Sequence, residues 1–129
     1  MKNGFVVIAV CLVVFLFGCA SHEAGLQENG LKPMTQAELE SLLSNGFEGT
    51  FETSKSSGTI QYNPDKTASS TWSGGSGSGT YEIKNGLHCV RWDFRNNVER
   101  CGRWYKVNEK EYHVVDPDSG TLFGKMYLK

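Results

Sequence analysis

Two cysteines in neighbouring segments are the residues whose types and spacing indicate the most definite chemistry. Cys89 and Cys101 each lie in a run of alternating apolar and polar residues, and an Asn-Asn turn separates the runs. In an oxidising compartment two such thiols pair, and an antiparallel hairpin can place them opposite each other. The same register aligns two further complementary pairs: Arg91 with Glu99, and Trp92 with Val98. We therefore predict a Cys89–Cys101 disulfide, whose loop of about 13 residues contributes about 3 kcal/mol to stability.

One arginine and several aromatic residues form the candidate binding site. In the register above, Arg100 falls opposite Val90, on the face of the hairpin that we assign to the core. A cation on that face must either reach solvent or find an anionic partner. It therefore either extends to the rim of the sheet, or is turned outward by a bulge, or contacts an anionic ligand in a pocket. The aromatic residues that would line that pocket are Trp72, Tyr81, Trp92 and Trp104.

The other reactive residue types do not form a catalytic or metal-binding set. His88 and His113 lie within predicted strands, where a structural role is the simpler interpretation, and the serines cluster in glycine-rich segments. No pair of carboxylates has glycosidase-like spacing, and Asp116-x-Asp118-x-Gly120 lacks the remaining ligands of a calcium loop. Two cysteines cannot complete a tetrahedral metal site. We expect no enzyme activity, no catalytic residue, no metal and no cofactor.

The first nineteen residues have the layout of a bacterial secretory signal. A basic start at Lys2 precedes an apolar run over Phe5–Phe17, which ends at Gly18-Cys19. The run is shorter than the roughly 20 apolar residues of a spanning helix. A cysteine after a small residue resembles the lipobox of bacterial lipoproteins, which implies acylation of Cys19 as the new N-terminus. A plain signal peptide and an uncleaved anchor are the alternatives; we predict a signal peptide over residues 1–18.

Composition limits the partners of the mature chain. Removing Lys2 from 13 Lys and Arg leaves 12 basic residues against 14 acidic ones, so nucleic acid is not an expected partner. Membrane attachment must then come from acyl chains and not from a polybasic patch. By resemblance to enterobacterial sorting, Ala20 after the anchor favours the outer membrane. We therefore predict a lipid-anchored envelope protein that faces the periplasm.

Helix and turn signals divide the rest of the chain. Residues 19–33 are polar and glycine-containing, and they predict a flexible tether. One short helix follows, which begins at the capping box of Thr35 and Glu38 and ends at Asn45-Gly46. Residues 34–129 are expected to form a single β-rich domain.

Everything after Gly46 predicts short strands rich in Thr, Val, Ile and aromatic residues. Asn85-Gly86 predicts a two-residue hairpin turn, and its register places Tyr81, Ile83, Val90 and Trp92 on one face, which we assign to the core. The segment Gly74–Gly79 is predicted to be a mobile hairpin loop. Seven or eight strands with tight turns predict an antiparallel meander that forms a small barrel or sandwich. The expected strands are Phe47–Thr53, Gly58–Asn63, Thr67–Ser73, Thr80–Lys84, Leu87–Phe94, Val98–Val107, Glu111–Val115 and Leu122–Leu128.

Three segments of the sheet, Gly79–Ile83, Gly86–Trp92 and Glu99–Tyr105, resemble a family of small exported proteobacterial domains of unknown function. The shared pattern is Gly-x-aromatic-x-Ile, then Leu-Cys-x-x-Trp, then Cys-x-x-aromatic-Tyr. Here His88 separates the Leu from the Cys of the second motif. The resemblance implies a β-rich, disulfide-linked exported domain and transfers no activity.

These features together predict a non-catalytic module, anchored in the cell envelope, that binds a small molecule of unknown identity. The alternative is a protein-interaction lipoprotein, either an envelope-assembly accessory or a lysozyme-inhibitor-like protein. Such inhibitors carry Ser-Gly and Trp-x-Lys-Gly loop motifs that this chain lacks in that form. An interaction protein would use an exposed apolar patch or the Gly74–Gly79 segment.

Overall fold

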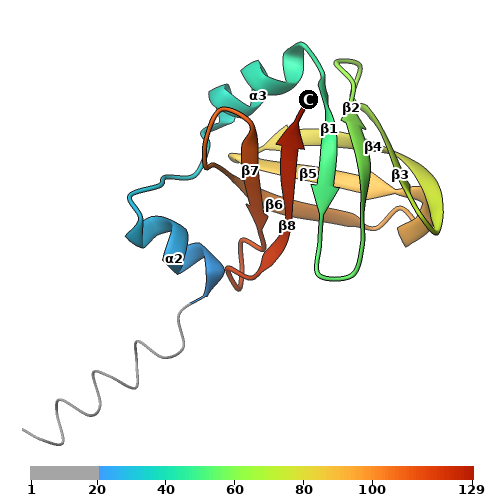
Figure 1. The fold of residues 1–129 in the computed structure, drawn as a ribbon. Helices are drawn as coiled ribbons and strands as arrows, with labels where there is room; N and C mark the ends of the chain where they lie inside the picture. Colours follow the sequence, from blue (N-terminus) through green and yellow to red (C-terminus); the bar gives the residue numbers. More distant parts are fainter. Residues whose placement is uncertain (1–20) are drawn as a thin grey trace, which may run out of the picture.

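The computed structural model describes residues 21–129, and these form a closed eight-stranded antiparallel barrel with two short helices (Figure 1). Each strand pairs with the next along the chain and the last pairs with the first, so the sheet has no free edge. The predicted meander is confirmed, and it closes into a barrel. Its strands are β1 (Phe47–Glu52), β2 (Ser57–Tyr62), β3 (Thr67–Trp72), β4 (Gly75–Lys84), β5 (Leu87–Trp92), β6 (Glu99–Lys106), β7 (Glu111–Val115) and β8 (Leu122–Leu128).

The predicted signal peptide and the acylated Cys19 lie outside the described residues, and both stay predictions. Within residues 21–129, no helix combines the length and the apolar character needed to cross a bilayer.

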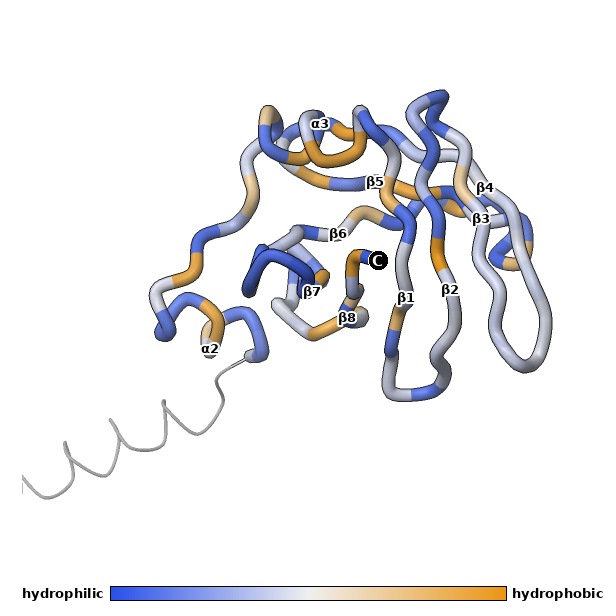
Figure 2. The backbone as a smooth tube through the Cα atoms, turned by 45° about the horizontal axis from the view of Figure 1, so that its top comes forward, coloured by the Kyte–Doolittle hydropathy of each residue, from blue (hydrophilic) through white to orange (hydrophobic). Residues whose placement is uncertain are grey.

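Helix α3 (Gln36–Ser44) closes one end of the barrel (Figure 1). It begins at the predicted capping box and presents Leu39 and Leu43, both fully buried, to the core cluster inside the strands. Figure 2 shows the apolar part of α3 on the side that faces the sheet. The Gln36 side chain fastens the helix to the β4–β5 hairpin, since it accepts from the Gly86 N–H and donates to the Ile83 carbonyl. The barrel is therefore plugged at this end.

The prediction of a flexible tether is wrong for residues 21–33. Helix α2 (His22–Glu28) forms there and packs on the outer wall of the barrel. Leu26 lies in a second apolar cluster with Tyr105 and Val115, outside the main core. The polarity of the segment suggested solvation, but several of its polar side chains bind the barrel wall instead.

The prediction of a mobile loop over Gly74–Gly79 is also wrong, because five of these six residues belong to β4. The strand alternates Gly inward and Ser outward, so its inner face carries no side chains at this point. A Cβ at Gly77 would lie 2.3 Å from the Phe94 ring, and a Cβ at Gly79 would lie 3.1 Å from the Trp92 ring. The glycines thus make room for Trp92 inside the barrel and for Phe94 at its open end.

A side chain at Gly77 should therefore displace Phe94. We expect Gly77→Val to lower the free energy of unfolding by about 1–3 kcal/mol, the usual cost of overpacking a core. Ser76→Val is the matched control, because the exposed outward neighbour should change stability by only about 0.5 kcal/mol or less. Guanidinium denaturation measures both variants. Equal stability for the two would contradict the inward placement of Gly77.

The predicted register of the β4–β5 and β5–β6 hairpins is confirmed apart from its outermost pair. Tyr81 pairs with Val90 across the first hairpin, and Cys89 pairs with Cys101 across the second. Val98 does not pair with Trp92; it is 65 % exposed, so the predicted apolar pair is wrong. A 3-10 turn, η1 (Asp93–Arg95), follows Trp92 and ends the ladder early.

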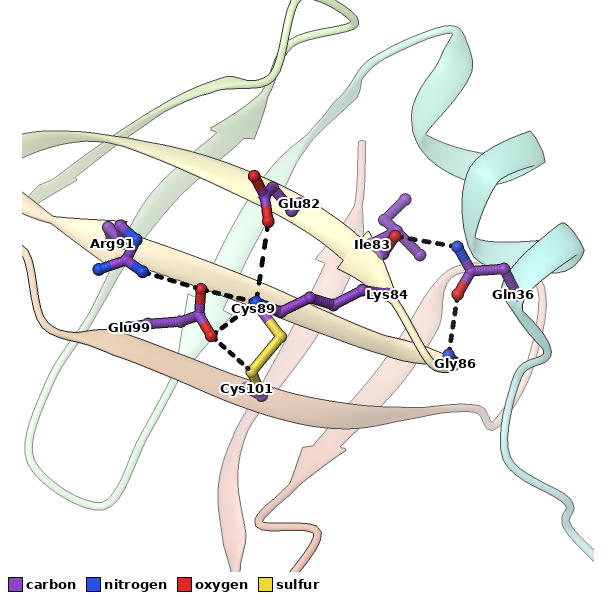
Figure 3. The surroundings of a disulfide bond; sticks show 9 residues. All are labelled: Gln36, Glu82, Ile83, Lys84, Gly86, Cys89, Arg91, Glu99 and Cys101. Carbon is purple, nitrogen blue, oxygen red and sulfur yellow. Dashed lines mark hydrogen bonds and ion pairs between the residues drawn. A yellow bond between two sulfur atoms is a disulfide. The ribbon is translucent and has the colours of Figure 1, made fainter.

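The Cys89–Cys101 disulfide is present, and it lies on the outer face of the barrel within a small charged cluster (Figure 3). Glu99 lies beside the disulfide and pairs with Lys84 at 2.9 Å and with Arg91 at 3.1 Å. The predicted Arg91–Glu99 pair on the disulfide face is thus confirmed. Because both sulfurs are bonded to each other, neither is a thiolate that could hold a metal beside Glu99.

Candidate functional site

A cavity of about 700 Å³ enters the barrel from the end opposite α3. The β1–β2, β5–β6 and β7–β8 loops surround its mouth, and its inner part extends to Tyr62, His88 and Trp104. Closed antiparallel barrels of this strand number are wide enough to hold one small ligand. The barrel therefore encloses a cavity of ligand size that is open at one end.

Two nitrogen atoms at the base of the cavity lack hydrogen-bond partners among the described residues. They are Nε1 of Trp104, which is fully buried, and Nε2 of His88, which is 3 % exposed. Both residues line the cavity. Both atoms are buried even from the cavity, so a polar partner can reach them only when a neighbouring side chain moves, and each unpaired atom costs about 1–3 kcal/mol.

The His88 imidazole is neutral in the folded protein. Burial lowers its pKa to about 3, and the positive charge of Lys66 adds to that shift. The ring lies between aromatic neighbours, with centroids 4.5 Å from Tyr62 and 5.1 Å from Tyr81. A neutral imidazole has one donor and one acceptor, and the Trp104 indole has one donor. The base of the cavity is therefore aromatic and uncharged.

Arg100 lies at the mouth of the cavity. It pairs with Val90 on the inner face as predicted, and its side chain reaches the rim, where it is exposed. The guanidinium lies 3.7 Å from the Phe123 ring centroid and takes part in none of the ion pairs within residues 21–129. Burial and the nearby charge of Arg95 lower the pKa of Arg100, while Asp116 opposes that shift. Its donors are thus available to a ligand.

A β-bulge brings Phe123 into contact with Arg100. Val115 pairs with Leu122 and Val114 pairs with Gly124, so Phe123 is an extra residue in β8. Strict alternation would not place both Phe123 and Gly124 toward the interior. Sequence reasoning missed Phe123 for this reason.

Four of the five predicted binding residues line the cavity, namely Trp72, Trp92, Arg100 and Trp104. Tyr81 does not, because its hydroxyl donates to the Asn63 carbonyl near the closed end, and its ring stacks on His88. Tyr81 therefore holds the base of the cavity in place instead of contacting its contents.

Aromatic and cationic side chains dominate the rim. Phe94, which the sequence did not single out, packs against two tryptophans. Its ring centroid lies 4.9 Å from that of Trp72 and 5.4 Å from that of Trp92. Lys55 and Arg95 join Arg100 among the lining residues, together with the acidic Asp116. The site thus combines aromatic walls with cations at the mouth.

Comparison with known proteins adds no further evidence. The chain matches no protein-family model, no curated protein and no solved structure at a significant level. Function must therefore be argued from the cavity itself.

Proposed function

We propose that this protein is a non-catalytic module that binds one small amphipathic molecule inside its barrel, and that acylation of Cys19 anchors it in the cell envelope. The open cavity with aromatic side chains in its lining and Arg100 at its mouth carries this proposal. The volume of about 700 Å³ lies within the range of known small-molecule sites. The outer membrane, facing the periplasm, is the location that the sequence favours.

The charge at the rim supports a ligand with an anionic group. Arg100 takes part in none of the ion pairs within residues 21–129, and its guanidinium rests on an aromatic ring. Its planar guanidinium suits bidentate contact with a carboxylate, phosphate or sulfonate. An anion at the mouth would keep part of its hydration, while the apolar part of the ligand would lie against Trp72 and Trp92.

Native mass spectrometry of the periplasmic protein, purified without refolding, tests the proposal directly. A mass excess that disappears on denaturation would show a bound small molecule and identify its class. A mass that corresponds to the chain alone would oppose the proposal and favour the second candidate, a protein-interaction lipoprotein. The exposed side chains of Phe94 and Val98 at the open end are the observation that favours this alternative.

The contribution of Arg100 can be measured with a matched pair of fluorescent probes. We expect Arg100→Met to weaken binding of anilinonaphthalene sulfonate roughly 10-fold to 100-fold, because a hydrogen bond to a charged group contributes about 1.5–3 kcal/mol. Binding of uncharged N-phenylnaphthylamine should stay the same. Arg91→Met is the control, since Arg91 lies on the outer face and pairs with Glu99. Unchanged sulfonate affinity in Arg100→Met would remove the anionic-ligand proposal.

A further inference from the structure

The start of α2 touches the rim of the cavity. The Glu23 N–H donates to the Gly120 carbonyl at 3.0 Å, and Ser21 lies so close that a Cβ on Gly120 would be 2.6 Å from its hydroxyl oxygen. Gly120 lies in the β7–β8 loop between Ser119 and Thr121, and both of these line the cavity. Figure 1 shows α2 beside this loop, at the end of the barrel opposite α3. The described chain thus begins at the mouth.

Buried polar contacts hold α2 in this position. The Glu23 carboxylate accepts from Arg103 at 2.8 and 3.0 Å and from the Tyr105 hydroxyl at 2.6 Å. The Glu23 side chain is only 12 % exposed, so this is a largely desolvated pair with a hydrogen-bonded third partner. The first turn of α2 is therefore fixed to the outer wall.

A second contact fixes the same turn. His22 Nε2 lies 3.0 Å from His113 Nδ1, and the other ring nitrogen of His113 lies 2.6 Å from the Glu111 carboxylate. His113 is 7 % exposed. Together, the contacts of His22 and Glu23 fix the position of the first turn of α2, and of Ser21 before it, on the barrel wall.

This position of Ser21 limits how far the mouth can lie from the lipid anchor. Cys19 precedes Ser21 by two residues in the sequence, and two residues span at most about 7 Å. This step rests on the proposed function, because it uses acylation of Cys19. With that anchor, the β7–β8 side of the rim must stay close to the bilayer surface.

Two exposed apolar side chains among residues 21–129 lie at the same end. Among residues 21–129, the large apolar side chains that are exposed are Phe94, at 45 %, and Val98, at 65 %. Both belong to the segment between β5 and β6, which borders a different part of the mouth from the β7–β8 loop. Aromatic side chains are favoured at the interface between lipid and water.

We infer that the open end of the barrel docks on the membrane surface to which the protein is anchored, so that the cavity mouth faces the lipid headgroups. The α2 contact fixes one side of the rim near the anchor, and Phe94 and Val98 supply apolar contact at another. Docking through the anchor and the apolar residues requires no anionic lipid, although Lys55, Arg95 and Arg100 also line the mouth. An amphiphile dissolved in that membrane would meet the cavity without crossing water.

Spin labels on the full-length acylated protein in phosphatidylcholine vesicles test this orientation. Single cysteines would be introduced at exposed positions by Ser54→Cys in the β1–β2 loop, Glu109→Cys in the β6–β7 loop and Glu28→Cys at the end of α2. We expect the Ser54→Cys label to have a several-fold higher ratio of oxygen accessibility to nickel-chelate accessibility than the Glu109→Cys label. The Glu28→Cys label should resemble Glu109→Cys.

Each other outcome overturns the docking inference. A lipid-facing label at Glu28→Cys would show that the barrel lies on its side, and a lipid-facing label at Glu109→Cys would show the reverse orientation. If all three labels are exposed to water on an acylated chain, the docked orientation is contradicted, while the ligand-binding proposal is not. An intact mass without acyl chains would remove the anchoring and the docking together. Val98→Ser, at a position that is 65 % exposed, should lower the Ser54→Cys ratio without changing thermal stability.

Discussion

Acidification from pH 7 to pH 4.5 is expected to destabilise the barrel through His88. The folded-state pKa of about 3 lies below the unfolded value of 6.5, so the unfolded chain takes up a proton first as the pH falls. The contribution of neutral His88 is fully present above pH 6.5 and decreases as the pH falls toward 3. Each pH unit within that window is equivalent to about 1.4 kcal/mol, so we expect a loss of roughly 2–3 kcal/mol by pH 4.5.

The size of this effect follows from the surroundings of the ring. His88 is 3 % exposed and contacts Tyr62, Tyr81 and Trp104, so an imidazolium there would lose nearly all of its hydration. The positive charge of Lys66 raises the cost further. Within residues 21–129 no acceptor is within hydrogen-bond reach of Nε2, so the protonated form gains nothing in return.

Urea denaturation at pH 7 and pH 4.5 measures the effect, and His88→Gln is the control. The variant should be less stable at pH 7 but should lose less stability on acidification. Other groups also contribute to the pH response, among them His22, whose pKa burial lowers, and Glu99, whose pKa the Lys84 hydrogen bond lowers. These groups are present in both proteins, so the difference between the two pH responses isolates His88. Identical responses would show that His88 is not a buried neutral base.

The parts of the fold that the sequence predicted are those set by short-range chemistry. The Asn85-Gly86 turn has positive φ at both residues, as its hairpin type requires, and it fixed the register of β4 and β5. The cysteine pair fixed the next hairpin in the same way. Because side chains in a strand alternate with a period of two, one correct pair assigns every neighbour to a face. Arg100 was placed on the inner face by this logic alone.

The parts that the sequence did not predict depend on contacts between distant segments. The polar sequence of residues 22–28 indicates a solvated segment. It packs on the barrel because Glu23 forms an ion pair with Arg103, which lies far away in the sequence, in β6. The glycine-rich segment Gly74–Gly79 indicates a loop from its composition alone. It belongs mostly to a strand whose glycines leave space for Phe94, a residue that follows β5. Phe123 enters the mouth only because of a bulge that no local pattern shows. The shape of the cavity depends on these contacts between distant segments. The sequence alone therefore could not show which residues form its base.

Removal of the Cys89–Cys101 disulfide is expected to lower the free energy of unfolding by about 3 kcal/mol. The bond joins residues separated by 12 positions, so it restricts the unfolded chain across the β5–β6 hairpin. In a domain of this size such a loss would lower the melting temperature by roughly 10 °C or more. The test is guanidinium denaturation of the Cys89→Ala, Cys101→Ala double variant beside the oxidised wild type.

Two controls separate the crosslink from the groups around it. Reduced wild type should unfold at nearly the same denaturant concentration as the double variant, because both lack the crosslink. Glu99→Gln should shift the denaturation midpoint much less than the double variant does, since its partners Lys84 and Arg91 are about half exposed to solvent. If the oxidised wild type and the double variant unfold together, the crosslink does not stabilise the hairpin. If the disulfide acts only on the unfolded chain, the folded double variant should keep its probe affinity, because Arg100 and Trp104 reach the cavity from the inner face of β6 and the disulfide lies on the outer face.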